Sequence, residues 1–147
     1  MIIFETNFEK IKKQISKSED KEIIFSSSDD ELNRKVLEKL GDKINILLLS
    51  QKDKKDFQKQ RNSGLNQVLA KIAKSNSVKI GINLDEILES STEEKAKILS
   101  RIKQNIKLCN KYKLNMKFIN LNPKNSRNSR DLKSLGLILG MNTQTLS

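Results

Sequence analysis

The stretch 44–84, INILLLSQKDKKDFQKQRNSGLNQVLAKIAKSNSVKIGINL, decides the fold. Residues 44–49 are nearly all apolar, which is typical of a strand that is covered on both faces. Residues 78–84 alternate between apolar and polar or small side chains, which predicts a second strand. Between the two strands lie a polar loop at 51–62 and an amphipathic helix with five expected inward residues: Leu65, Val68, Leu69, Ile72 and Ala73.

The same strand-then-helix pattern extends in both directions from this stretch. Further strands are expected at 2–4, 22–26 and 116–121, and further helices follow at 8–15, 28–40, 91–112 and 131–139. Capping boxes at 28–31 and 91–94 open two of the helices, and Gly41 and Gly140 fit helix ends. Strict alternation predicts an α/β fold with a parallel sheet and right-handed crossovers.

Five strand-helix units are too few to close an eight-unit barrel of about 250 residues. We therefore expect an open or incomplete TIM-barrel-like parallel sheet. At 147 residues, the chain is expected to form a single α/β domain over 1–147.

The composition indicates a folded protein of a reducing compartment. Apolar residues make up 35% of the chain but fall in regular patterns, and Cys109 has no partner for a disulfide. No apolar run approaches the length of a membrane span, and the N-terminus does not read as a signal peptide. We expect a cytoplasmic location and no membrane partner.

The charge is unevenly distributed along the chain. The formal net charge is +11, and residues 101–147 hold ten basic side chains and one acidic side chain. This excess favours a surface that faces a polyanion. The alternative is compositional, because a chain rich in Lys, Asn and Ile is typical of an AT-rich genome.

The usual catalytic side chains are missing. The chain has no His, and Cys109 falls on the apolar stripe of a helix, where a core residue is expected. Asp85 and Glu86 follow the fourth strand, either as turn and cap residues or as the carboxylates of a small hydrolase. We expect no catalytic residue, no metal site and no cofactor in this chain.

Basic side chains gather in two loops and on one helix. The loops after the third and fifth strands carry Lys52, Lys54, Lys55, Lys59 and Arg61 in one, and Arg127 and Arg130 in the other. Both loops lie at the same edge of a parallel sheet, which predicts an RNA-facing rim. The helix shows a ridge opposite its apolar stripe, which is either a phosphate-binding surface or a solvated face: Lys97, Arg101, Lys103, Lys107 and Lys111.

Several segments resemble one known family. Residues 61–73, RNSGLNQVLAKIA, are a near-verbatim match to the signature of ribonuclease P protein component 3, and residues 104–112, QNIKLCNKY, are similar to its "QNIRLCRKY" helix. Residues 30–34, 43–47, 78–84 and 130–141 resemble further elements in the same order, so the resemblance covers 22–141. Family members commonly carry Pro where Ser129 stands, and they are longer.

The resemblance implies a TIM-barrel-like subunit of ribonuclease P, an endonuclease whose RNA uses Mg²⁺ to remove the 5' leader of precursor tRNA. The implied partners are ribonuclease P RNA, protein component 2, other protein subunits and, indirectly, precursor tRNA. Positions matching the family motifs give the candidates for RNA or partner contacts: Arg34, Arg61, Lys71, Arg101, Lys107, Lys111, Arg127 and Arg130. Four more are expected to shape the signature loop: Asn62, Ser63, Gly64 and Asn66.

Two other functions stay open on this reading. A diverged chain of this fold could serve as a protein-protein interaction platform, and Asp85 or Glu86 could support a carboxylate-based hydrolase. RNA that co-purifies with the chain, protein alone, or turnover by the chain itself would separate the three.

Overall fold

A computed structural model describes residues 1–52, 54–59 and 61–145. Five strands form one parallel sheet in the order in which they occur in the chain, from β1 to β5. Register pairs such as Leu47 with Ile80 and Ile82 with Phe118 show each strand parallel to the next. The strands are β1 (Ile2–Ile3), β2 (Ile24–Ser26), β3 (Ile46–Leu49), β4 (Lys79–Asn83) and β5 (Met116–Ile119).

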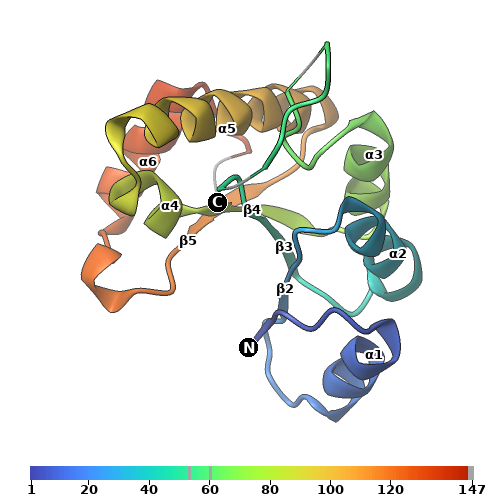
Figure 1. Cartoon of the computed structure of the whole chain (residues 1–147). Helices are drawn as coiled ribbons and strands as arrows, with labels where there is room; N and C mark the ends of the chain where they lie inside the picture. The colour runs from blue at the N-terminus through green and yellow to red at the C-terminus, as the bar shows by residue number, and fades with distance from the viewer. Residues whose placement is uncertain (53, 60, 146–147) are drawn as a thin grey trace.

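The helices cover one face of this sheet. Figure 1 shows α1, α2, α3, α5 and α6 in an arc around the strands. Consecutive right-handed crossovers that always step in the same direction place their helices on the same side, as in the wall of a barrel. The open, incomplete TIM-barrel-like sheet is thereby confirmed. The helical elements are α1 (Phe8–Lys17), α2 (Asp30–Leu40), α3 (Gln67–Ser75), α4 (Leu84–Glu89), α5 (Thr92–Tyr112), the 3-10 helix η1 (Pro123–Asn125) and α6 (Ser129–Leu139).

The two faces of the sheet carry two separate hydrophobic clusters. Strand side chains such as Phe25 and Ile80 pack under the helices, together with Cys109 of α5. Burial raises the pKa of the Cys109 thiol to about 12, as befits the core residue that was expected. The opposite, concave face holds a smaller cluster of Ile24, Ile46, Leu48 and Ile119, with Ile2 packed against it.

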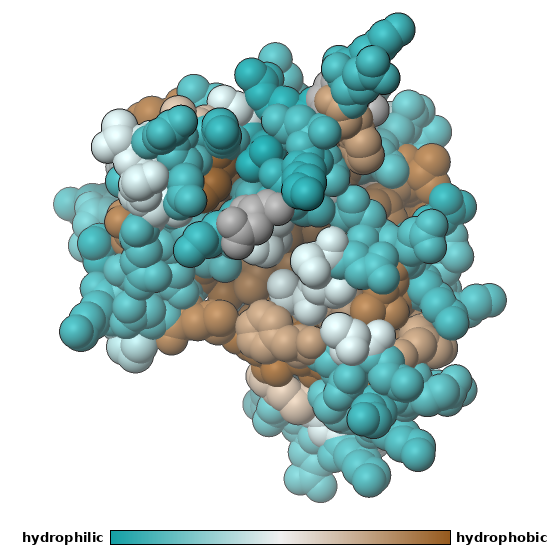
Figure 2. Space-filling view, viewed as in Figure 1, coloured by the Kyte–Doolittle hydropathy of each residue, from teal (hydrophilic) through white to brown (hydrophobic). Residues whose placement is uncertain are grey.

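The concave face is strongly curved and open to solvent in part. Gly81 faces it, and a Cβ at that position would come within 3.1 Å of Leu48 Cδ1, so only glycine fits there easily. Lys117 Nζ reaches Glu22 Oε2 at 3.5 Å, which links the start of β5 to the approach to β2, three strands away. Figure 2 shows apolar side chains gathered in a hollow on this side of the molecule.

Some expectations about single residues are wrong. Val68 does not face the core: it is 47% exposed, and Ala70 is buried on α3 instead. Leu84 begins α4 rather than ending a strand, and Leu121 is exposed beyond the end of β5. At Leu84 and Leu121 the apolar pattern ran one or two residues past the strand that the tertiary contacts stabilise.

The helix termini agree with the predicted capping in part. Ser91 caps α5 by accepting a hydrogen bond from Glu94 N–H, as expected, and Gly140 ends α6 with a left-handed φ of 106°. At α2 the cap is Asp29 rather than Ser28, and Gly41 keeps a right-handed conformation. Glycine fits at 41 because a Cβ there would collide with the Leu37 carbonyl oxygen and would lie 2.7 Å from Asn76 Nδ2.

Candidate nucleic-acid interface

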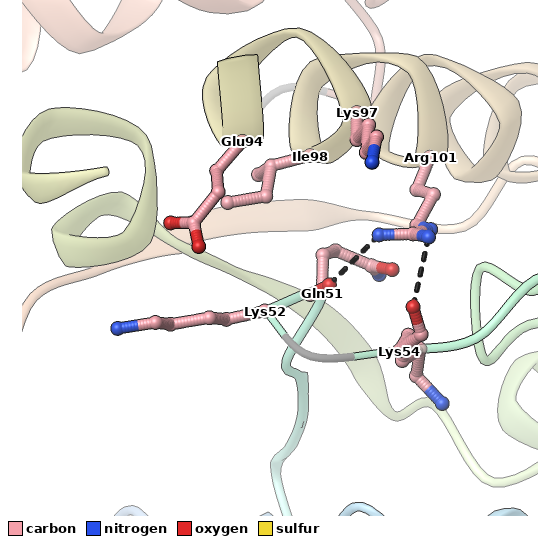
Figure 3. Close-up of a pocket in the computed structure, with 7 residues that line it drawn as sticks. All are labelled: Gln51, Lys52, Lys54, Glu94, Lys97, Ile98 and Arg101. Atoms are coloured by element: carbon pink, nitrogen blue, oxygen red, sulfur yellow. Dashed lines mark hydrogen bonds between the residues drawn. The ribbon is translucent and has the colours of Figure 1, made fainter. Parts of the chain in front are cut away.

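The basic loop, residues 51–62 between β3 and α3, is fastened to α5 by Arg101. Its guanidinium donates to Gln51 O at 3.1 Å, to Lys54 O at 2.9 Å and to Asp56 Oδ1 at 3.1 Å. Figure 3 shows the Arg101 side chain reaching from α5 toward the backbone of Gln51 and Lys54. Arg101 is only 6% exposed, so the prediction that it lies on the ridge opposite the apolar stripe of this helix is wrong.

Two amides of α5 extend this attachment to the signature loop, residues 61–66. Asn105 Nδ2 donates to Ser63 O at 3.0 Å, and Gln51 Nε2 donates to the same carbonyl at 2.8 Å. Gln104 Nε2 donates to Arg61 O at 3.3 Å. Because Gln51, Ser63 and Asn105 are buried, these bonds replace lost water contacts and define the path of the loop.

The signature loop is also held by its own residues. The Asn62 side chain accepts a hydrogen bond from Gly64 N–H, and Asn66 caps α3 by accepting one from Leu69 N–H. Gly64 has a φ of 79°, and a Cβ there would lie 3.2 Å from Lys54 Cε. A side chain at position 64 would therefore be strained by both backbone and packing.

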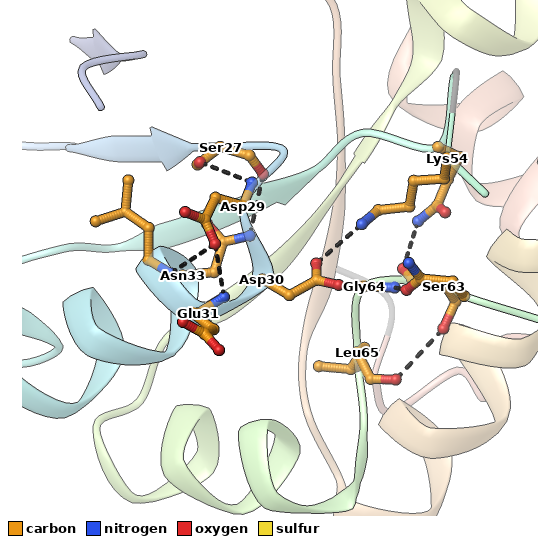
Figure 4. Close-up of polar contacts among 12 residues, drawn as sticks. Ser27, Asp29, Asp30, Glu31, Asn33, Lys54, Ser63, Gly64 and Leu65 are labelled. Carbon is orange, nitrogen blue, oxygen red and sulfur yellow. Dashed lines mark hydrogen bonds and ion pairs between the residues drawn. The ribbon is translucent and has the colours of Figure 1, made fainter. Parts of the chain in front are cut away.

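Lys54 joins the basic loop to α2. Its Nζ donates to Asp30 Oδ1 at 2.9 Å, and the Lys54 side chain is only 8% exposed. Figure 4 shows this contact beside Ser63, Gly64 and Leu65 of the signature loop. Lys54 is thus engaged within the protein, whereas Lys52, Lys55 and Lys59 of the same loop are exposed.

Asp85 and Glu86, in the first turn of α4, hold the loops on either side of β4. Glu86 accepts hydrogen bonds from Ser50 Oγ and from Gln51 N–H, the latter at 2.8 Å, where β3 passes into the basic loop. Asp85 accepts from Leu121 N–H at 2.8 Å and from Asn122 N–H at 3.1 Å, after β5. These are contacts of turn and cap residues.

Asp85 stays ionised because of these donors. Partial burial by itself raises the pKa of Asp85, but hydrogen bonds from Asn125 Nδ2, Leu121 N–H and Asn122 N–H together hold that pKa below its usual value. The Arg101 hydrogen bond, helped by Asn62 N–H, lowers the pKa of Asp56 in the same way. Over residues 1–52, 54–59 and 61–145, no cluster of three or more His, Cys, Asp or Glu side chains could hold a metal ion.

Open hollows surround the basic loop. One of about 440 Å³ lies over the carboxyl ends of the strands and is lined by Ser28, Ser50, Lys52, Lys54, Lys55 and Asn62. Ammonium groups and hydroxyls in one hollow are suited to phosphate oxygens. A second, of about 390 Å³, lies between the loop and the outer side of α3 and α5, with Phe57, Arg61 and Gln104 among its lining residues.

The outer side of α3 and α5 continues this basic surface. Lys71 of α3 and Lys111 of α5 lie over the same ring, with their Nζ atoms 6.0 Å and 5.4 Å from the centre of Tyr112. Lys107 is exposed one turn before Lys111. The two helices thus bring together three of the predicted contact residues next to the loop that carries Arg61.

The chain resembles known proteins in sequence. It is 46% identical over 56 residues to ribonuclease P protein component 3 of Methanosarcina acetivorans, covering 38% of this chain and 23% of that protein. It is 29% identical over 112 residues to the protein of the same name from Methanococcus vannielii, covering 75% and 45%. In sequence, this chain is similar to ribonuclease P protein component 3. It spans less than half the length of these two curated relatives, and no family model matches it.

A solved structure shares the fold of this chain. A chain of the cryo-EM structure of archaeal ribonuclease P with mature tRNA superposes with a TM-score of 0.79 at 23% identity. The match covers 95% of this chain and 59% of that chain, so the longer protein continues beyond the five strand-helix units present here. At this identity the likeness concerns the fold.

The remaining predicted contact residues of this component 3 relative lie apart from the loop. Arg34 is on α2 and pairs with Glu38 of the same helix at 2.8 Å. Arg127 and Arg130 are exposed at the start of α6, where Arg127 donates to Lys124 O and Ser126 O. They follow the loop that Asp85 holds, so α4 separates them from the basic loop along the sheet edge.

Sequence reasoning missed the residues that position the loop. Gln51 and Asp56 carry no feature that sets them apart in a polar chain. A signal was nevertheless present for two of the α5 residues. Arg101 and Asn105 are spaced by four and fall three residues after Ile98 and Ile102, which places both on the apolar stripe rather than opposite it.

Proposed function

We propose that this chain is a protein subunit of ribonuclease P, which binds the RNA subunit and other protein subunits and assists removal of the 5' leader from precursor tRNA. The observation that carries the proposal is the basic loop that Arg101 fixes at the carboxyl edge of the sheet, in a relative of component 3. A loop held in one conformation presents its cations to phosphates without a large ordering cost.

In this proposal the chain binds RNA mainly through phosphate contacts. The exposed side chains of Lys52, Lys55, Lys59 and Arg61 supply them on the loop, and Lys107 and Lys111 supply them on α5. Such contacts position an RNA without selecting a base sequence. Arg101 contributes indirectly by positioning the loop, because its N–H groups donate to loop acceptors.

The proposal assigns the chemistry to the RNA. Phosphodiester hydrolysis needs an activated water and charge stabilisation at the leaving oxygen, and RNA-bound Mg²⁺ can supply both. The two carboxylates beside the loops are already engaged: Asp85 with three donors and Glu86 with two. The holoenzyme is then an endoribonuclease in which this chain contributes binding and no cofactor of its own, in the cytoplasm.

Protein component 2 is the proposed protein partner. The concave sheet face offers a second kind of surface, because Phe4 is 57% exposed just after β1 and alternates to the side of Ile2. This apolar face also favours the alternative function, a platform for protein partners alone.

No helix among the described residues is long and apolar enough to cross a membrane.

Affinity purification of the tagged chain from its native cell, followed by sequencing of bound RNA, tests the proposal. Ribonuclease P RNA together with component 2 is the expected result. A matched variant with Lys52, Lys55 and Lys59 changed to Glu should lose the RNA while keeping its melting temperature, because these side chains are exposed. Recovery of proteins without RNA would favour the platform.

A further inference from the structure

Phe57 is an exposed aromatic side chain in the middle of the basic loop. It is 55% exposed, whereas Phe25 and Phe118 are buried in the core. The chain has five Phe, one Tyr and no Trp, and Phe4, on the concave sheet face, is the other Phe that is more than half exposed. Its described neighbours in the loop include the exposed cations Lys55, Lys59 and Arg61.

The ring borders a hollow that has room for a nucleobase. The hollow measures about 390 Å³, and Arg61, Asn62 and Gln104 line it with polar groups. Leu65, Leu69 and Leu108 give it an apolar part. A site with apolar walls and a few amide groups matches a base, which has two apolar faces and a polar edge.

The charges around the hollow favour a nucleic acid over an acidic or neutral protein segment. Asp30, which lines the hollow, pairs with Lys54, and Asp56, which precedes Phe57 in the chain, pairs with Arg101. Arg61 accepts a hydrogen bond from Gln104 through its backbone carbonyl, and the residue is exposed. The net charge beside Phe57 is therefore positive.

The loop holds Phe57 in a defined place. Asp56, the preceding residue, accepts hydrogen bonds from Arg101 Nε at 3.1 Å and from Asn62 N–H at 3.0 Å. The second bond joins Asp56 to the start of the signature loop. Fixing the residue before Phe57 limits the directions in which the ring can point. Binding therefore costs less conformational entropy.

We propose that Phe57 is a stacking platform for one unpaired nucleotide of a bound RNA, with the base against the ring and the adjacent phosphate beside Arg61. The inference rests on the proposed function and adds what that function leaves open: the loop recognises a single-stranded position and not only a phosphate track. Stacking of this kind is tolerant of base identity, because every base has a π-face.

A single-Trp reporter tests this inference directly. Phe57→Trp places the chain's only Trp at the proposed site, and Ile138→Trp, at an 80% exposed position of α6, is the matched control. Titration with a 12-nucleotide oligouridine is expected to quench the Phe57→Trp emission, and a blunt RNA duplex of equal length is expected to leave it nearly unchanged. The Ile138→Trp emission should respond to neither.

Affinity measurements complete the test. Phe57→Ala should weaken oligouridine binding about ten-fold while the salt dependence stays the same, since a stacking contact and no phosphate contact is lost. Phe57→Tyr should bind like the wild type. An unchanged melting temperature of Phe57→Ala is expected because the ring is exposed.

The other possible outcomes overturn the stacking role of Phe57, the proposed function, or both. Wild-type RNA binding without quenching of Phe57→Trp, and with full affinity of Phe57→Ala, removes the stacking role and leaves the proposed function standing. Loss of component 2 binding by Phe57→Ala with RNA affinity intact makes the ring a protein anchor instead. Failure of the wild-type chain to bind either oligouridine or ribonuclease P RNA overturns the proposed function and the inference together.

Discussion

The Arg101 guanidinium on α5 lies 3.1 Å from the Asp56 carboxylate of the basic loop, 45 residues away in the chain. The same side chain also donates to two loop carbonyls, so this buried arginine makes three of the contacts that fix an otherwise exposed loop. Arg101 thus positions other basic residues instead of presenting its own charge. The planar guanidinium suits this task, because its Nε, Nη1 and Nη2 atoms each donate to a different acceptor from fixed positions.

Replacing Arg101 should loosen the loop and destabilise the protein. Arg101→Met leaves the buried Gln51 carbonyl without its donor, and we expect a loss of roughly 2–3 kcal/mol in urea unfolding. Trypsin should cut after Lys55, Lys59 or Arg61 faster in this variant. Arg34→Met is the control, because the exposed Arg34–Glu38 pair is expected to contribute under about 1 kcal/mol. Equal stability of both variants would mean that Arg101 does not anchor the loop.

Acid should weaken the attachment of the loop after β5. The folded pKa of Asp85 is lowered, so its contribution to stability is complete above the unfolded pKa of about 3.9 and is lost as the pH falls through the folded value. Asp85→Asn should therefore be less stable than wild type by roughly 1–2 kcal/mol at pH 7. Urea midpoints measured from pH 7 to pH 2.5 should converge below about pH 4. A constant difference across that range would contradict this assignment.

The strand and helix order could be predicted because each unit carries its own period and its own caps. Residues 44–49 and 78–84 show the buried and the alternating pattern that a covered parallel sheet requires. Val68 was predicted wrongly because local periodicity does not say which side of a short helix meets a neighbour, and Ala70 is small enough to pack there.

The candidate site was predictable only in outline. The loops after β3 and β5 and their charge follow from the sequence, but the partners of each side chain depend on contacts across the chain. Lys54 and Lys55 are adjacent and chemically identical, yet Lys54 pairs with Asp30 while Lys55 is exposed. That difference arises because α2 packs next to Lys54 in the folded protein, and nothing in the sequence around Lys54 indicates it.

The salt dependence of RNA binding should show whether Arg127 and Arg130, beside the start of α6, contact RNA phosphates. Arg127→Ala with Arg130→Ala removes two exposed cations, which should reduce the slope of log affinity against log salt by roughly 1 to 2 units at about 0.7 to 0.9 per phosphate contact. Filter binding with ribonuclease P RNA between 50 and 300 mM salt, about the range over which phosphate contacts are felt, measures it. An unchanged slope would move the RNA face away from α6, and Lys103, Lys107 and Lys111 would be changed next.

The concave face should make the isolated chain dependent on a partner. Five strands leave open sheet edges and an exposed Phe4, so we expect self-association or marginal stability. Sedimentation should show concentration-dependent association that Phe4→Ser reduces, and added component 2 should raise the melting temperature by mass action. A cooperative, monomeric transition that is insensitive to component 2 would contradict this expectation.

The most direct test of the central claim is cleavage of precursor tRNA by purified components. The chain alone with Mg²⁺ is expected to leave the substrate intact, and adding it with component 2 to the catalytic RNA should increase leader removal or lower the Mg²⁺ requirement. Arg61→Ala should weaken that stimulation if the signature loop contacts RNA or the partner. Metal-dependent cleavage by the chain alone, abolished in Asp85→Ala, would contradict the account and make the chain a hydrolase.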